Sequence, residues 1–183
     1  MPFKKIVSSL LLLPLILFVS CGEAAPSGQK NVLETNEYSM QIPATWAEVD
    51  DTSIKTTLPE GTFRAAKATL ALEGIYSKVT ISKETLLLEM SSLKYADANI
   101  TKAPLITSSY TKLDERDIDI AGEKTKLHIF NAKTSNDAPM LLFLQAYVVK
   151  DQHAGYTISF STVPSEKNYD KYIALFKTFT LKK

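Results

Sequence analysis

Two histidines are the residues of this chain best suited to binding a metal or moving a proton, and their surroundings support neither role. His128 and His153 have no cysteine or carboxylate at metal-ligand spacing beside them in the sequence. A zinc site needs three or four ligands, so we predict none here. His128 lies between apolar neighbours, where we expect a strand residue that faces solvent. His153 precedes an Ala-Gly pair, which predicts a hairpin loop between two strands.

The densest group of carboxylates surrounds Arg116 and consists of Asp114, Glu115, Asp117 and Asp119. Several carboxylate oxygens in one loop can gather calcium. This segment lacks the glycine and the distal bidentate glutamate of an EF-hand. We therefore predict a solvated turn between strands rather than a calcium site.

Signatures of nucleophilic catalysis and of nucleotide binding are absent from the sequence. No Gly-x-Ser-x-Gly motif occurs, and the 6 glycines are scattered singly, which leaves no glycine-rich phosphate cradle. Serines are plentiful, but a nucleophile needs an adjacent base oriented by a third group, and no such triad can be identified from sequence. We predict no catalytic residue, no metal, no cofactor and no enzymatic activity.

The aromatic residues offer binding surfaces rather than reactions. Trp46, the only tryptophan, follows a strand and a proline, a position that favours a buried core residue over an exposed binding anchor. Tyr95, Tyr110 and Tyr147 either line a groove or pack as ordinary strand and helix aromatics. Ordinary packing is the safer interpretation of these tyrosines.

Cys21 is the only cysteine, and its position indicates attachment rather than catalysis. It follows a positive pair, Lys4-Lys5, and an uncharged, mainly apolar stretch over residues 6–18. A helix that spans a bilayer needs ~20 apolar residues, so this shorter stretch is typical of the hydrophobic region of an export signal. Residues 1–20 are therefore predicted to be a signal peptide.

Residues 17–22, Leu-Phe-Val-Ser-Cys-Gly, resemble the lipobox of bacterial lipoproteins, although Phe18 stands where leucine is most often found. The resemblance implies that the chain is cut before Cys21 and that this cysteine carries two or three acyl chains. At about 0.8 kcal/mol for each buried methylene, two chains hold a protein stably on a membrane. Gly22 in place of aspartate implies sorting to the outer membrane of a two-membrane bacterium, on its periplasmic face, whereas a one-membrane host would leave the protein outside the plasma membrane. The alternative is an ordinary signal peptide that leaves Cys21 as a free thiol.

The overall charge is close to neutral. Removing residues 1–20 takes two of the 21 basic residues and none of the 20 acidic ones, so the formal charge changes from +1 to −1. Nucleic-acid binding rests on a basic patch, and no cluster of Lys and Arg is visible, so we predict no nucleic-acid partner. With its single cysteine committed to lipid, the mature chain forms no internal disulfide.

A linker and one globular domain account for the rest of the chain. Residues 21–36 have the polar, Gly- and Pro-containing composition of a lipidated N-terminus followed by a flexible linker, and we predict a single domain over 37–183. A domain of this length buries roughly 70% of its unfolded surface without disulfides. It begins with Tyr38, Met40 and Ile42, which alternate with polar neighbours as in a half-buried strand.

Helices are predicted at two places. Ser82 is a candidate N-cap for a helix over residues 83–95, and a second helix begins at Ser165 with one face apolar throughout. The stretch 63–72 is ambiguous, because its alanines favour helix. The run 140–149 is nearly continuously apolar, which indicates a central strand covered on both faces. Further strands are predicted over residues 53–58, 75–81, 105–113, 117–120, 123–132 and 156–160.

Runs of strands with two separated helices predict an α+β fold, in which a mainly antiparallel β-sheet is flanked by helices. This order of elements resembles the PsbP-like α/β/α sandwich. The residues that carry the resemblance lie at the two ends of the domain: Tyr38, Met40, Ile42, Pro43 and Trp46 at the front, and Tyr172, Ile173, Phe176 and Phe179 at the back. The resemblance implies an accessory subunit or adaptor of a larger complex rather than an enzyme.

We therefore expect a membrane-anchored bacterial envelope lipoprotein that acts as a non-catalytic accessory or binding module for another envelope protein. The alternative is a carrier or sensor of a small apolar ligand held between the sheet and the helix that begins at Ser165, whose large apolar residues favour it. An apolar cavity of roughly 300 Å³ or more would favour the carrier, and a filled core would favour the accessory module.

Overall fold

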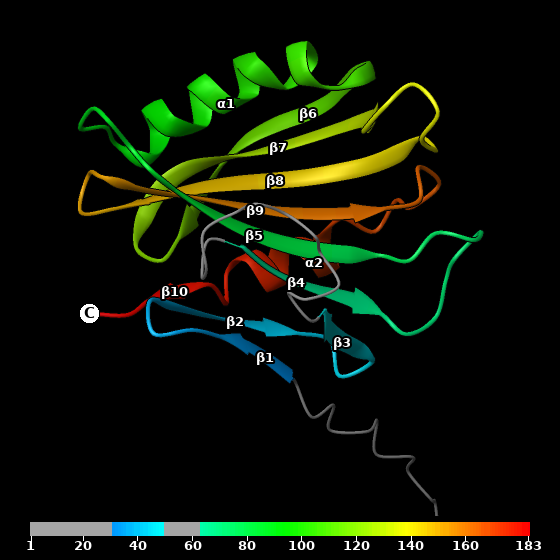
Figure 1. Ribbon diagram of the computed structural model, residues 1–183, viewed down its shortest axis with the longest axis horizontal. Coiled ribbons are helices and arrows are strands. Elements are labelled where there is room, and N and C mark those ends of the chain that lie inside the picture. The colour runs from blue at the N-terminus through cyan, green and yellow to red at the C-terminus, as the bar shows by residue number, and fades with distance from the viewer. Residues whose placement is uncertain (1–30, 50–62) are drawn as a thin grey trace, which may run out of the picture.

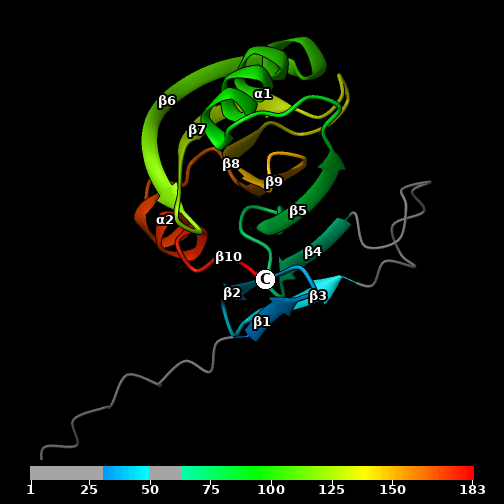
Figure 2. The ribbon, with the colours of Figure 1, turned by 90° about the vertical axis from the view of Figure 1, so that its left-hand side faces the viewer.

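A seven-stranded antiparallel sheet separates two unlike layers in the computed structural model, which describes residues 31–49 and 63–183. One helix, α1, lies on one face of this sheet, and helix α2 lies on the other face together with a small three-stranded sheet (Figure 1). The turned view shows the same three layers, with α1 and the small sheet on opposite sides of the molecule (Figure 2). This arrangement confirms the predicted α+β fold class.

The strand order of the large sheet is β3-β4-β5-β9-β8-β7-β6, and that of the small sheet is β1-β2-β10. Helix α1 spans Ser92–Ile106 and helix α2 spans Asp170–Phe176. The strands are β1 (Asn31–Glu34), β2 (Tyr38–Ile42), β3 (Trp46–Val49), β4 (Phe63–Ala68), β5 (Lys78–Thr85), β6 (Ser108–Ile120), β7 (Glu123–Lys133), β8 (Leu141–Lys150), β9 (Ala154–Thr162) and β10 (Thr180–Leu181).

The main core fills the space between the large sheet and the layer of α2 and the small sheet. Alternate residues of β9 point into it, so Phe160 lies 4.9 Å from Phe176 and 5.3 Å from Tyr172 between ring centroids. Trp46 packs on the same phenylalanine at 6.0 Å, which confirms its predicted place in the core. The large apolar residues of α2 therefore pack against core side chains of the sheet. They do not line the ligand cleft that the sequence suggested for this helix.

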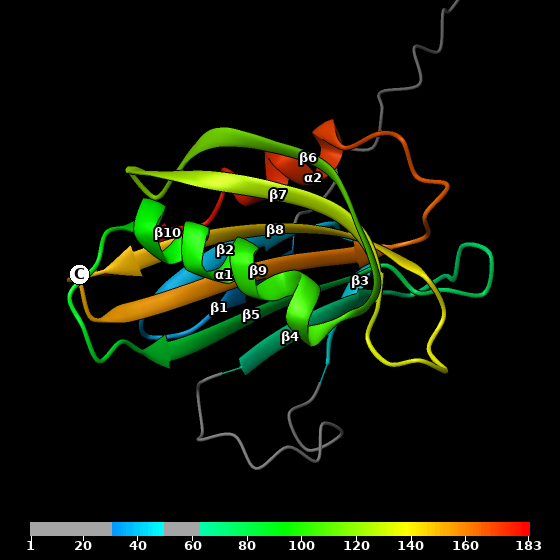
Figure 3. The ribbon, with the colours of Figure 1, turned by 90° about the horizontal axis from the view of Figure 1, so that it is seen from above.

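The other face of the sheet carries a different set of side chains. Helix α1 contacts β6, β7 and β8 and buries a small cluster built on Tyr95, Ala96, Tyr147 and Val149. Seen from above, α1 crosses the strands obliquely (Figure 3). Ser82 and Thr157, on this face, are only half-buried, so the sheet is less completely covered here than on the α2 side.

The helix predicted over residues 83–95 is wrong in position. Residues 78–85 form β5, which pairs with β9 along its whole length, and Ser82 lies opposite Thr157 in that ladder. The helix begins at Ser92, where the Ser91 hydroxyl accepts a hydrogen bond from the Lys94 N–H. Leu87, at helical spacing in the sequence, is 96% exposed. Strand pairing with a distant segment overrides the local helical pattern.

Three other boundaries also differ from prediction. Helix α1 continues to Ile106, so the strand expected from residue 105 begins at Ser108, and α2 begins at Asp170 rather than at Ser165. The ambiguous segment at 63–72 is strand β4 over its first part. The predicted linker over 21–36 is corrected at its end, because Asn31–Glu34 forms β1 and Leu33 is fully buried in the core. The strand expected over 53–58 lies outside the described residues.

Candidate functional site

The residues singled out from the sequence are dispersed in the structure. Cys21 lies outside the described residues, and its lipidation stays a prediction. His153 lies in the β8–β9 turn, as predicted, with its Nε2 3.6 Å from the Glu89 Oε1. Among residues 31–49 and 63–183, no group of three or more His, Cys, Asp or Glu side chains is placed to hold a metal ion. Nor does any helix in those ranges have the length and apolarity needed to cross a bilayer.

The prediction for His128 is wrong, because this residue is fully buried. Its Nε2 is hydrogen-bonded to the Tyr110 hydroxyl at 2.8 Å, and its ring stacks on Phe130 with 4.4 Å between centroids. Its Nδ1 has no hydrogen-bond partner among the described residues. Burial lowers the pKa of His128 to about 4, and the nearby Glu115 carboxylate opposes this shift only in part. The histidine is therefore neutral near pH 7.

The acidic group around Arg116 lies within strand β6. The prediction of a solvated turn between two strands is therefore wrong. Glu115 accepts hydrogen bonds from Lys112 at 2.6 Å and from Lys126 at 3.0 Å, and these bonds lower the pKa of its carboxyl group. Lys126 also pairs with Asp97 of α1 at 2.6 Å. These charges therefore serve to tie α1 to the β6–β7 hairpin.

A pocket of about 350 Å³ opens beneath α1, on the side of the helix that faces β5 and β9. The helix contributes residues three or four positions apart, which share one face of an α-helix. The sheet contributes side chains from β5, β7, β8 and β9. The lining residues are Ser82, Lys83, Glu84, Tyr95, Asn99, Ala103, Ile106, Thr107, Phe130, Gln145, Tyr147 and Thr157.

Two tyrosines define the interior of this pocket. Tyr95 donates a hydrogen bond to the Glu84 Oε1 at 2.6 Å and lies 3.1 Å from the Thr157 hydroxyl. Tyr147 donates to the Gln145 Oε1 at 2.9 Å. Burial raises the pKa of Tyr95 and of Tyr147 well above the usual range, and the bond to Glu84 raises that of Tyr95 further. Both phenols stay neutral near pH 7, so they offer ring faces and hydrogen bonds rather than phenolate chemistry.

Of the three tyrosines considered from the sequence, the structure brings two together. The rings of Tyr95 and Tyr147 meet edge to face at 6.1 Å in the buried cluster beneath α1, as ordinary packing predicts, and both also line the pocket. Tyr110 lies apart from the pocket lining, on His128. Sequence reasoning missed Glu84 and Gln145, since Glu84 fell within the predicted helix 83–95 and Gln145 is a single polar residue in a nearly continuously apolar run.

A glycine allows Tyr95 to reach the sheet. A Cβ at Gly155 of β9 would lie 2.6 Å from the Tyr95 Cζ and 3.0 Å from its hydroxyl oxygen, closer than side-chain atoms approach one another. We expect Gly155→Ala to displace the ring and to lower the free energy of unfolding by about 1–3 kcal/mol, measured by urea denaturation. In a Tyr95→Ala background the same substitution is expected to cost almost nothing. Equal costs in both backgrounds would contradict this contact.

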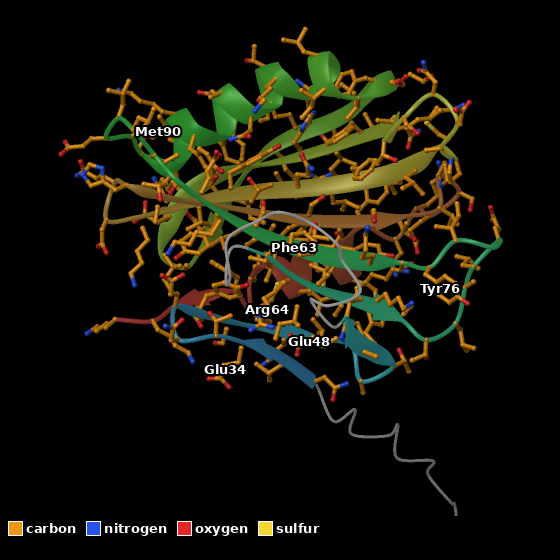
Figure 4. The ribbon with its side chains drawn as sticks, viewed as in Figure 1. Glu34, Glu48, Phe63, Arg64, Tyr76 and Met90 are labelled. Atoms are coloured by element: carbon orange, nitrogen blue, oxygen red, sulfur yellow. The ribbon has the colours of Figure 1, made fainter. Side chains whose placement is uncertain are left out.

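Exposed apolar side chains gather near the two ends of α1. Leu87 and Leu88, 96% and 73% exposed, lie in the connection that precedes the helix, and Leu105 and Ile106, 81% and 64% exposed, end it. Strand β1, where the described chain begins, lies on the opposite side of the molecule: Glu34 and Met90, which precedes α1, are widely separated (Figure 4). The α1 side therefore faces away from the N-terminal end of the domain.

Comparisons with known proteins identify the fold. No protein-family model matches the sequence, and no curated protein matches it either. Three solved structures are each 13% identical to this chain. The match to the Saccharomyces cerevisiae Ran-binding protein Mog1p has a TM-score of 0.56 and covers 85% of this chain and 96% of Mog1p. The match to cyanobacterial PsbP from Synechocystis has a TM-score of 0.53 and covers 90% of this chain and 99% of that protein. A Pseudomonas aeruginosa protein of unknown function has a TM-score of 0.53 and covers 82% and 92%.

These likenesses define the class of the protein by its fold. The chain has a PsbP-like α+β sandwich, as the sequence predicted, and it shares this fold with proteins from yeast, a cyanobacterium and Pseudomonas. At 13% identity the likeness is one of fold, and activity has to be argued from the residues of this chain.

Proposed function

We propose that this chain is a lipid-anchored protein of the bacterial envelope that acts as a non-catalytic binding module for another envelope protein. The observation that carries the proposal is that two features lie on opposite sides of the domain. Strand β1, which follows the predicted lipid attachment site, lies on one side of the domain, and α1 lies on the other (Figure 1). The exposed leucines are at the ends of α1. A domain tethered through its N-terminus would present those leucines away from the membrane.

The length of chain between the anchor and the domain suits such a display. Nine residues, 22–30, separate Cys21 from the first residue of β1. An extended chain spans at most about 3.5 Å per residue, so the domain would remain within about 30 Å of the lipid surface. Leu87 and Leu88 are exposed neighbours, as are Leu105 and Ile106, and exposed apolar patches on a folded domain mark interaction surfaces. A protein of the same fold, Mog1p, is described as Ran-binding, which is a precedent for protein binding by this architecture.

The anchor is tested by Cys21→Ser in a bacterial host that processes lipoproteins. We expect the wild-type protein to partition into the detergent phase and the variant to remain in the aqueous phase, because the acyl chains have no sulfur to join. Ser20→Ala keeps a small residue before the cleavage point and is the matched control, with partitioning unchanged. A native protein whose mass corresponds to a bare thiol or to an uncut leader would contradict the anchor.

The binding face is tested by photo-crosslinking in intact cells of the native host. A photoreactive residue at Leu88 or Leu105 is expected to give one adduct of discrete mass, because these side chains lie on the face that the tether would present. The control position is Val32, which is 50% exposed on β1. Adducts of equal yield from Val32, or none from the α1 positions, would contradict this surface as the site of docking.

A further inference from the structure

The pocket beneath α1 has the composition of a site for a positively charged small molecule. We infer that it binds a small organic cation, an amine or quaternary ammonium with a short apolar or aromatic body, between the face of α1 and strands β5, β8 and β9. The pocket lies beneath α1 and meets the exposed apolar group at the end of the helix only at Ile106, and the inference does not depend on the tether. The volume of about 350 Å³ lies in the range of small-ligand pockets.

Aromatic rings form the inner wall. Tyr95, Tyr147 and Phe130 all line the pocket and are almost completely buried as residues, so their positions are set by packing. Aromatic rings are suited to a site for an amine, because the quadrupole of a ring attracts a cation. The same rings and Ala103 offer apolar contact to the uncharged body of a ligand.

The charged side chains of the lining select against anions. Glu84 is exposed at the edge of the pocket, and its Oε1 accepts a hydrogen bond from the Tyr95 hydroxyl. The one cationic residue of the lining, Lys83, forms an ion pair with Glu37 of the small-sheet layer, and this pair compensates its charge. An ammonium group beside Glu84 would therefore meet a carboxylate next to the Tyr95 hydroxyl, with the apolar lining left for its uncharged body.

The site is organised before any ligand arrives. Tyr95 is held by hydrogen bonds with Glu84 and Thr157 and rests on the Cα of Gly155. Gln145 is fixed from both ends, since its Oε1 accepts from Tyr147 and its Nε2 donates to Ser159 at 3.1 Å. A pocket whose side chains are already ordered loses little conformational entropy on binding.

Calorimetric titration with two probes of similar shape tests the inference. Phenylethylamine is a cation near neutral pH, and 2-phenylethanol is its uncharged counterpart. We expect the folded wild-type domain to bind phenylethylamine saturably at concentrations up to roughly millimolar, and about tenfold more tightly than 2-phenylethanol. No saturable binding of phenylethylamine, or equal affinity for the two probes, would overturn the proposal.

Two charge-matched variants locate the effect. Glu84→Gln is expected to lose the preference for the amine, whereas Asp137→Asn, in the exposed β7–β8 turn at the opposite end of the strands, is expected to keep it. Glu84 is exposed, so its replacement leaves the fold intact, and thermal unfolding verifies this for both variants. A preference that survives in Glu84→Gln, or that disappears equally in both variants, would show that this pocket does not recognise the cation.

Discussion

Replacing Phe160 with alanine is expected to lower the free energy of unfolding by about 3–5 kcal/mol, the largest effect of any single core substitution considered for this domain. Phe160 is fully buried on β9, and its ring touches Trp46 of β3 and both Tyr172 and Phe176 of α2. Truncation removes the apolar contact between three elements at once. It also leaves a cavity that the rigid sheet cannot close.

Phe143 is the matched control for this measurement. It is only half-buried, and it projects from β8 toward the α1 side, where it stacks on Phe130 with 5.1 Å between centroids. Phe143→Ala is therefore expected to cost no more than about 2 kcal/mol in the same denaturant titration. Equal losses in the free energy of unfolding would mean that the space around Phe160 is loosely filled. They would then support a ligand cleft beside α2, against the packing of Tyr172 and Phe176.

Local patterns were sufficient to predict most strands of this fold. The nearly continuous apolar run at 140–149 predicted a central strand with two covered faces, and β8 does lie between β9 and β7 with residues of both faces buried. The alternation of Tyr38, Met40 and Ile42 likewise marked β2. Burial on one face or on two leaves a direct trace in the sequence, so these elements are recoverable without tertiary information.

Non-local pairing accounts for what local patterns missed. Leucines at 86–88 fit a helix by spacing alone, but residues 78–85 are held in β5 by a strand that lies some seventy positions later in the chain. His128 was expected in solvent because its neighbours Leu127 and Ile129 alternate with it. The second face of β7 is covered by helix α1 and by Tyr110 of β6, which the sequence of β7 does not encode.

The candidate pocket illustrates the same limit for function. Its key side chains, Glu84, Tyr95, Gln145 and Thr157, come from four elements that the sheet order and the α1 crossing bring together. Tyr95 and Tyr147 could be named from sequence as aromatic candidates for a groove, whereas the carboxylate beside them could not be distinguished from other exposed acids. Cys21 is the reverse case, since its prediction rests on sequence alone.

Folding stability is expected to fall as the pH drops from about 6.5 to about 4, and His128 is the cause we assign. In the unfolded chain its pKa would be near the ordinary 6.5, and burial lowers it to about 4 in the folded domain. Between these values the unfolded chain binds more protons, so acid favours unfolding. Above pH 6.5 the histidine is neutral in both states, and the free energy of unfolding is not reduced by its burial. The loss of stability by pH 4 amounts to on the order of 3 kcal/mol.

The surroundings of His128 oppose its protonation because they offer the cation little compensation. Glu115 attracts it, but that carboxylate is already bonded to Lys112 and Lys126, and Lys112 itself disfavours a second positive charge. A ring that stays neutral can stack on Phe130 and keep its bond to Tyr110 without a counterion. The acid sensitivity therefore follows from a buried titratable group with no free partner for its charge.

Replacing His128 with phenylalanine separates this cause from general acid denaturation. The variant keeps an aromatic ring on Phe130, removes the proton-binding group, and frees the buried site of an unpaired Nδ1. We expect the free energy of unfolding of the variant to change much less than that of wild type between roughly pH 4 and 6.5. Urea denaturation at several pH values measures this difference. His153→Gln, at the exposed histidine of the β8–β9 turn, should retain the wild-type slope. If His128→Phe and wild type lose stability in parallel, other groups carry the acid response and the burial of this imidazole does not govern it.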